Sequence, residues 1–234
     1  MRWTRAAATL AVASSSTAPL RICVVGAGSI GREFALHHFG QATNTVVSTV
    51  VDLDTEAAKK LAADVGSVQS GASVVGDNKY KATASSCEGE PVATSDVLDA
   101  AVLKACEIVY VGTPPSSHRK LVMVALEAGK HVLLEKPVAA SGDDADAIVA
   151  AAEAAAARGV HVGMNIGMRW NRALRKMRKL VVEEQALGVL QSAHITLHFM
   201  QWPREWQTVP WCRGRKEGGP LREVGADFRV TRLA

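Results

Sequence analysis

Residues 20–31 read LRICVVGAGSIG, in which a short apolar run passes directly into three glycines spaced as GxGxxG. An apolar run that ends in glycines is typical of a buried strand, and residues 29–39 continue with a helical pattern. In such a strand-turn-helix, the first glycine permits the tight turn, the second lets phosphates approach the backbone, and the third allows close packing. Free N–H groups at the helix start favour an anion. The stretch therefore predicts a dinucleotide-binding unit, with pyrophosphate contacts from Gly26, Ala27, Gly28, Ser29, Ile30 and Gly31.

An acidic residue ends the second predicted strand. Residues 45–51 form a β-branched run, and Asp52 follows it, 21 residues after Gly31. Its carboxylate can accept hydrogen bonds from the adenosine ribose and would repel a 2′-phosphate, and neither Leu53 nor Asp54 supplies a compensating cation. The sequence therefore favours NAD over NADP. A glycine-rich turn that binds another ligand, or none, is the alternative that these residues leave open.

Strands and helices alternate along the chain, which predicts an α/β fold with a Rossmann-type, doubly wound parallel sheet. Residues 66–90 lack sustained periodicity, so we expect them to form a surface insertion, and Ser141 is expected to cap a helix. The expected strands are 22–25, 45–51, 91–94, 108–111, 131–134, 160–164 and 189–199, with a late helix at 173–184. The predicted domains are a leader or flexible extension at 1–19, a Rossmann domain at 20–138, and an incomplete α+β domain for substrate and subunit contacts at 139–234.

Composition narrows the possible functions. The chain has 234 residues, of which 48% are hydrophobic, and a net charge of +4. Arg2 and Arg5 carry two of those charges, so the excess elsewhere is too small to indicate nucleic-acid binding. No run reaches the roughly 18 apolar residues that a membrane span needs. We expect a soluble cytoplasmic protein, or a mitochondrial or other organelle protein if residues 1–19 are a transit segment; a weak secretory signal is a further interpretation.

The cysteines and histidines carry no metal signature. Among the four cysteines, Cys23 and Cys106 lie in or beside strand-like runs, and no CxxC pair occurs, so reduced core thiols are expected. His194 and His198 have a ligand-like spacing, but they lie in a run that suits a strand and have no partner cluster. We therefore expect no metal site.

Two further motifs follow strands, at the edge where open α/β sheets bind ligands. They are TPPSSH at 113–118 and AGKHVLLEKP at 128–137. Together with GAGSIG and the strand-end Asp52, they resemble the glucose-fructose oxidoreductase / inositol dehydrogenase / rhizopine-catabolism (Gfo/Idh/MocA) family over residues 20 to about 138. The resemblance implies a Rossmann domain followed by an α+β domain with a mainly antiparallel open sheet. It also implies hydride transfer between NAD(P) and an alcohol carbon of a small sugar, polyol or dihydrodiol.

The resemblance further implies that Lys136, in the EKP motif, is catalytic and also contacts the cofactor. A lysine at the cleft can polarise or protonate the substrate oxygen as hydride moves to or from carbon. Glu135 would orient the cofactor or this lysine. The alternative for Lys136 is a surface lysine at a strand end.

Other cofactor contacts are expected from the same edge of the sheet. Thr113 and Pro114 would contact the cofactor ribose, and His118 would either line the cleft or pack at the start of a helix. In NIGMRWNR at 165–172, Arg169 matches a family arginine that lines the cleft, and a basic solvated helix is its alternative.

The last motif departs from the family pattern. GGPLREVG at 218–225 resembles the stretch before a DxGxH-type motif, with Glu223 at the position of the catalytic acid but Asp227 where histidine is expected. An aspartate donates a proton near neutral pH only if its pKa rises strongly. The family continues well beyond this point, so the second sheet would have unpaired edges, which favours a homo-oligomer through that sheet.

Three functions remain open on this basis. The first is an NAD-dependent dehydrogenase of the kind described, in a shortened form. The second is a catalytically weak or inactive dinucleotide-binding protein or truncated isoform. The third is a Rossmann reductase acting on imines or biliverdin-like substrates, which can share the first half of the chain.

Overall fold

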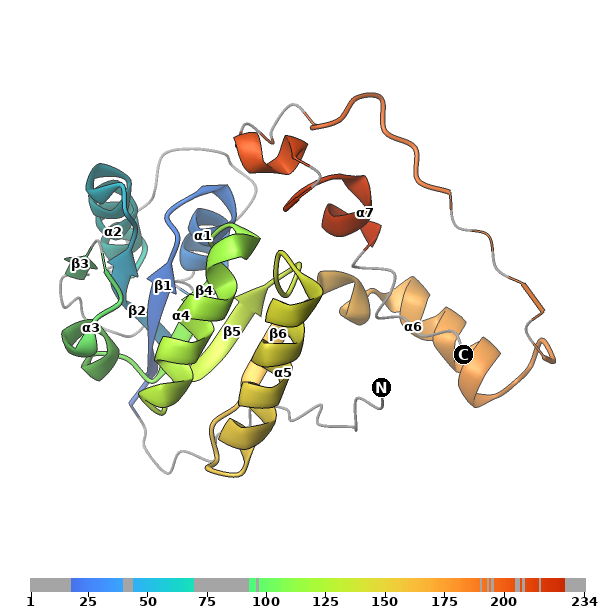
Figure 1. Ribbon diagram of the computed structural model, residues 1–234, viewed down its shortest axis with the longest axis horizontal. Helices are drawn as coiled ribbons and strands as arrows, with labels where there is room; N and C mark the ends of the chain where they lie inside the picture. The colour runs from blue at the N-terminus through green and yellow to red at the C-terminus, as the bar shows by residue number, and fades with distance from the viewer. Residues whose placement is uncertain are drawn as a thin grey trace.

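A six-stranded parallel sheet is the central element of the fold (Figure 1). Its strands are β1 (Leu20–Val25), β2 (Thr45–Val51), β3 (Ala93–Ser95), β4 (Ile108–Val111), β5 (His131–Glu135) and β6 (Val162–Asn165). They lie in the order β3-β2-β1-β4-β5-β6, and every neighbouring pair is parallel. The order reverses between β1 and β4, as in dinucleotide-binding folds, so the predicted α/β class is confirmed.

The computed structural model describes residues 18–39, 44–69, 93–95, 97–189, 191–192, 194, 196–204, 207, 209–214 and 216–225. Most of the leader predicted at 1–19 and most of the insertion predicted at 66–90 therefore lie outside the described residues. In the described part, no helix is both long and apolar enough to cross a membrane.

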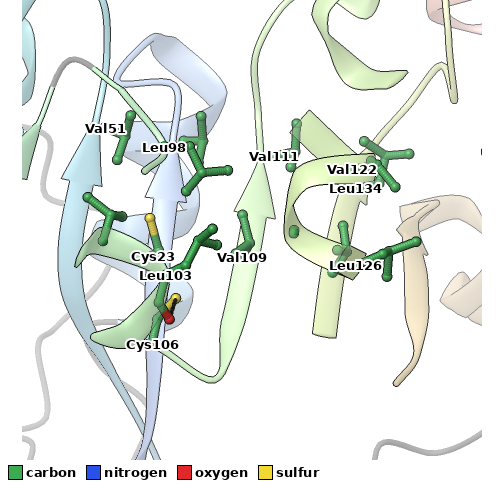
Figure 2. Packing of buried hydrophobic residues seen from close by; sticks show 14 of the residues in the cluster. Cys23, Val51, Leu98, Leu103, Cys106, Val109, Val111, Val122, Leu126 and Leu134 are labelled. Atoms are coloured by element: carbon green, nitrogen blue, oxygen red, sulfur yellow. Dashed lines mark hydrogen bonds between the residues drawn. The ribbon is translucent and has the colours of Figure 1, made fainter. Parts of the chain in front are cut away.

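Helices cover both faces of the sheet, which explains why its strands are apolar along most of their length. The helices are α1 (Ser29–Phe34), its π-helical continuation η1 (Ala35–Phe39), α2 (Thr55–Gln69), α3 (Ala100–Lys104), α4 (Pro115–Glu127) and α5 (Gly142–Ala156). One core, between the sheet and α1 and α2, contains Leu61 and Tyr110. Figure 2 shows the other core, where Val109 and Leu134 from the sheet lie near Val122 of α4.

The end of α2 differs from the sequence expectation. The predicted insertion begins at residue 66, but the helix continues to Gln69, which is buried. The Gln69 side chain accepts a hydrogen bond from the Val47 N–H at 2.7 Å and donates to the Val47 carbonyl at 3.3 Å. This amide therefore bonds the backbone of β2 as another strand would, and it holds the last turn of the helix against the sheet.

The parallel sheet extends beyond residue 138, where the sequence places the end of the Rossmann domain. Ser141 caps α5 as predicted, because its hydroxyl accepts a hydrogen bond from the Asp144 N–H at 3.2 Å. After α5 the chain enters β6, which pairs in parallel with β5, and Asn165 lies opposite Glu135. Residues 139–165 thus form one more helix-strand unit of the same sheet.

The residues after β6 form short helices. They are η2 (Gly167–Trp170), α6 (Arg172–Arg178), its continuation η3 (Lys179–Glu183), η4 (Pro210–Arg213) and α7 (Pro220–Glu223). The helix predicted at 173–184 is present, but the described residues of the strand predicted at 189–199 are not in a strand. No second sheet occurs among the described residues past Asn165, and Val189 is 82% exposed. Because a strand needs neighbouring strands to pair its backbone, a lone apolar run does not form one here.

Candidate functional site

Two glycines of the GxGxxG turn are required by the packing of the chain itself. Gly26 has φ +105°, and a Cβ atom there would lie 2.8 Å from the Gly112 carbonyl oxygen and 3.2 Å from Thr113 Cγ2. A Cβ atom on Gly31 would overlap the carbonyl oxygen of Gly26. The Gly26 N–H donates to the Val51 carbonyl at 2.8 Å. The turn is therefore held tightly between β2 and the loop after β4.

Gly28 is different, because none of the described residues requires it to lack a side chain. Its φ is −69°, and within the described part of the chain no atom lies within 4 Å of where its Cβ would stand. It also precedes α1 without any side-chain cap on the helix, and Ser29 and Ile30 beside it are exposed. Open space beside an uncapped helix start suits an anionic ligand that approaches the backbone closely. These residues therefore fit a dinucleotide pyrophosphate.

Asp52 lies beside the turn with its carboxylate oriented by backbone groups. Oδ2 accepts a hydrogen bond from the Ala27 N–H at 2.7 Å, and Oδ1 accepts one from the Asp54 N–H at 2.9 Å. Each oxygen keeps a further lone pair, so the carboxylate can still accept hydrogen bonds from ribose hydroxyls. Asp54 is engaged in capping α2, where it accepts from the Ala57 N–H at 3.1 Å. The carboxylate is thus held beside the glycine turn with lone pairs left to accept hydrogen bonds from a ligand.

The loop after β4 is pinned by its own side chains. The Thr113 and Ser117 hydroxyl oxygens lie 2.6 Å apart, and the Ser117 hydroxyl donates to the Pro114 carbonyl at 2.8 Å. His118 is fully buried beneath the loop, with Nε2 2.8 Å from the Thr113 carbonyl oxygen and Nδ1 3.2 Å from that of Val138. His118 therefore lies between the loop after β4 and the loop after β5, and its neutral ring can donate a hydrogen bond to one of these two carbonyls. It packs at the start of α4, which was one of its two predicted roles.

Burial lowers the pKa of His118, and its contacts with backbone carbonyls only partly oppose that effect. The folded protein therefore binds a proton at His118 less readily than the unfolded chain, so the neutral ring favours folding above pH 6.5 and this contribution is lost as the pH falls below it. We expect the melting temperature to fall between pH 7 and pH 5, and to fall less in His118→Asn. Burial also lowers the pKa of His131, so the pH dependence of the melting temperature is measured in His131→Asn as well, for comparison with His118→Asn. An unchanged pH dependence of the melting temperature in His118→Asn would contradict this assignment.

Lys136 and Glu223, which are 87 residues apart in the sequence, meet at the end of β5. Lys136 Nζ donates to the Glu223 carbonyl oxygen at 2.6 Å and lies 3.4 Å from the carboxylate oxygen Oε2. The Lys136 side chain is 23% exposed and that of Glu223 only 7%. Glu223 Oε1 is buried and has no hydrogen-bond partner among the described residues. An ammonium group, an ion-paired carboxylate and a free acceptor oxygen thus share one small region.

The segment that carries Glu223 is anchored to the Rossmann sheet at two further points. The Ser116 N–H, at the start of α4, donates to Glu217 Oε2 at 3.0 Å. Arg222 donates to the Ala140 carbonyl oxygen at 2.5 Å. Residues 216–225 therefore lie against the carboxyl ends of β4 and β5, and Figure 1 shows α7 at that edge of the sheet.

Glu135 is buried behind Lys136 and is held by two side chains that the sequence does not single out. The Tyr110 hydroxyl donates to its Oε1 at 2.9 Å, and Asn165 Nδ2 donates to the same oxygen at 2.6 Å. The Lys136 N–H donates to Oε2 at 3.2 Å. The sequence signal that could have identified Tyr110 is its phenol, which lies in an otherwise apolar strand two residues before Gly112.

Two predicted site residues are not brought to this cluster by the described contacts. Arg169 is exposed in η2, and its guanidinium carbon lies 5.9 Å from the centroid of the neighbouring Trp170 ring. Asp227 lies outside the described residues. In the part of the chain that is described, no group of three His, Cys, Asp or Glu residues could hold a metal ion, and Cys23, Cys106 and Cys212 are buried free thiols.

Comparison with known proteins gives a consistent set of matches. Residues 20–164 match the Gfo/Idh/MocA family model, described as an oxidoreductase family with an NAD-binding Rossmann fold. A 1,5-anhydro-D-fructose reductase from Ensifer adhaerens is 30% identical over 187 residues, which cover 78% of this chain and 48% of the relative. An inositol 2-dehydrogenase from Acidiphilium cryptum is 33% identical over 166 residues, covering 71% of this chain and 42% of the relative.

A solved structure shares the fold. GenD2 from gentamicin A biosynthesis, in complex with NAD, superposes with a TM-score of 0.65 at 22% identity, covering 92% of this chain and 53% of that protein. The chain thus spans about half the length of the relatives that it matches.

Proposed function

The chain belongs to the Gfo/Idh/MocA family of oxidoreductases with an NAD-binding Rossmann fold, and we propose that it binds NAD and transfers hydride between nicotinamide and an alcohol carbon of a small sugar, polyol or dihydrodiol. The observation that carries this proposal is the mostly buried ammonium of Lys136, held at the carboxyl end of β5, which neighbours β4 and so lies one strand away from the point where the strand order reverses. Ligands of open α/β sheets bind at that edge.

The chain's own residues suit cofactor binding. Gly28 and the start of α1 would bind the pyrophosphate, and Asp52 would accept hydrogen bonds from the adenosine ribose. Thr113 and Pro114 would contact the second ribose. We include Ser29, Ile30, Glu135 and Arg169 as further contacts on the strength of the family pattern. When bound, the nicotinamide supplies the acceptor or donor of hydride.

Lys136 would hold or move the proton at the substrate oxygen. Its partial burial beside a carboxylate keeps the ammonium in place, and an ammonium there stabilises negative charge that develops on that oxygen. Glu223 would keep the ammonium oriented through Oε2, and its unpartnered Oε1 can accept a hydrogen bond from a substrate hydroxyl. Asp227, four residues further on, remains a proposed contributor where the family has histidine.

The residues after β6 would contribute to a substrate domain and to contacts between copies of the chain. Their exposed apolar side chains, among them Leu187 and Met200, support this proposal. The alternative of an inactive dinucleotide-binding protein gains no support from the relatives, whose names are those of a reductase and a dehydrogenase. Turnover on a panel of polyols, aldoses and dihydrodiols with NAD decides between them, since cofactor binding without turnover on any of these would favour the alternative.

The preference for NAD is tested by thermal shift with NADH and NADPH. We expect NADH to raise the melting temperature more than NADPH, because the Asp52 carboxylate would repel a 2′-phosphate. In Asp52→Asn, which keeps an oxygen for the Ala27 N–H but removes the charge, the ratio of the two dissociation constants should shrink by about tenfold, roughly one charge-assisted hydrogen bond. Equal shifts with the two cofactors in the unsubstituted protein would remove the argument from Asp52.

A further inference from the structure

The buried carboxylate of Glu135, on β5, is bonded by side chains from the two flanking strands, β4 and β6. Glu135 ends β5 and is 5% exposed. Tyr110 lies opposite Leu133 in the β4–β5 register, two residues before Glu135, so the phenol and the carboxylate project from the same face of the sheet. Asn165 is the register partner of Glu135 on β6. Both side chains donate to Glu135 Oε1, at 2.9 Å from Tyr110 and 2.6 Å from Asn165.

These two hydrogen bonds determine where the other oxygen of the carboxylate lies. With Oε1 bound from both sides, Oε2 accepts a hydrogen bond from the backbone N–H of Lys136 at 3.2 Å. A buried carboxylate depends on such donors, because each lost partner leaves a desolvated charge poorly compensated. Burial and the neighbouring Glu135 both raise the pKa of Tyr110, so its hydroxyl keeps its proton and remains a donor at neutral pH.

The Tyr110 ring is itself fixed by the cofactor-binding elements. It is fully buried and stacks on Phe34 at the end of α1, with ring centroids 5.0 Å apart. A Cβ atom on Gly112 would lie 2.8 Å from Tyr110 Cε1, so the ring packs directly beneath the loop after β4. A Cβ atom on Gly26 would in turn lie 2.8 Å from the Gly112 carbonyl oxygen. One rigid side chain therefore connects the glycine turn, the β4 loop and the end of β5.

We propose that Tyr110 and Asn165 are positioning residues, which fix Glu135 from the two flanking strands and thereby set the backbone at Lys136 and the place of its ammonium group. The proposal rests on the function proposed for Lys136 above. Tyr110 and Asn165 act through Glu135, whereas Lys136 itself would meet the substrate.

The test measures the position of Lys136 without requiring turnover. The full-length chain is treated with an N-hydroxysuccinimide ester of acetic acid, and mass spectrometry follows the acylation of Lys136 relative to Lys120, an exposed lysine on α4. Nζ of Lys136 is bonded to Glu223 and only partly exposed, so it should react slowly in the unsubstituted protein. In Tyr110→Phe and in Asn165→Ala its relative rate should rise by about fivefold, the size expected for one lost hydrogen bond.

A matched control separates positioning from general loss of stability. Ile148→Val removes one methylene from the core on the opposite face of the sheet and should lower the melting temperature while leaving the Lys136 acylation ratio unchanged. An unchanged ratio in both Tyr110→Phe and Asn165→Ala, or an equal rise in Ile148→Val, would overturn the proposal. If Tyr110→Phe does not fold, Asn165→Ala decides the matter alone.

Turnover provides a second, separable measurement. Where the unsubstituted chain is active, kcat should fall by about tenfold in both variants, while KM for NAD stays within about twofold, because only the placement of the acid-base group changes. A rise in KM for NAD with unchanged kcat would overturn the positioning role. If the unsubstituted chain binds NAD without turnover, the proposed function fails, whereas the acylation ratio still tests Tyr110 and Asn165.

Discussion

Lys136→Ala should lower kcat with NAD and the best substrate by more than about a hundredfold, the usual contribution of a positioned acid-base group. NADH binding should change little, because the pyrophosphate and adenosine contacts proposed here lie at the glycine turn and Asp52. The measurements are steady-state turnover and NADH fluorescence titration on the same preparations.

Two matched variants make this result interpretable. Removing the ammonium leaves the Glu223 carboxylate, whose side chain is only 7% exposed, without its cation, so Lys136→Ala will also lose stability. Lys136→Arg keeps a cation for Glu223, but a guanidinium does not release a proton near neutral pH, so it should fold well and still turn over poorly. Lys120→Ala makes the same change on an exposed face of α4 and should be fully active. Near-normal turnover in Lys136→Ala would remove this lysine from the mechanism.

The parts of the fold that sequence reasoning predicted are those that local chemistry determines. The glycine turn, the acid at the end of β2 and the Ser141 cap each depend on a few adjacent residues, and each is present. The limits of α2 and of the sheet depend on distant partners. Gln69 extends its helix because it can bond Val47 of β2, a contact that the composition of residues 66–69 does not reveal.

In the candidate site, too, sequence reasoning predicted individual residues but not the contacts between distant parts of the chain. The EKP motif and the resemblance to a family pattern indicated Lys136 and Glu223, but their contact depends on how the chain returns from residue 165 to 216–225. Spacing does not reveal that path, because it depends on bonds such as the one from the Ser116 N–H to Glu217. Tyr110 and Asn165 were not predicted as site residues. Tyr110 lies in an apolar run and Asn165 at a strand end, and their shared partner, Glu135, lies on another strand, which the sequence pattern does not reveal.

The glycine turn allows protein stability to be separated from ligand binding. In Gly31→Ala the new methyl group would overlap the Gly26 carbonyl oxygen, which is backbone and cannot rotate away. We expect a loss of about 3 kcal/mol or more in unfolding free energy, at the upper end of overpacking effects. That loss corresponds to a fall in melting temperature of roughly 6–12 °C for a chain of this size.

Gly28→Ala should show the opposite pattern. Among the residues that the structure describes, no atom lies within 4 Å of the added methyl group, and the φ of −69° suits alanine. The loss of stability should therefore be at most about 1 kcal/mol, from the weaker helix cap. The methyl group would instead enter the space assigned to the pyrophosphate, so NADH affinity should fall at least about tenfold, or 1.4 kcal/mol. Normal NADH binding by Gly28→Ala would show that the phosphates lie elsewhere. A normal melting temperature with weak NADH binding in Gly28→Ala, together with a lowered melting temperature in Gly31→Ala, would show that Gly28 serves the ligand and Gly31 the fold.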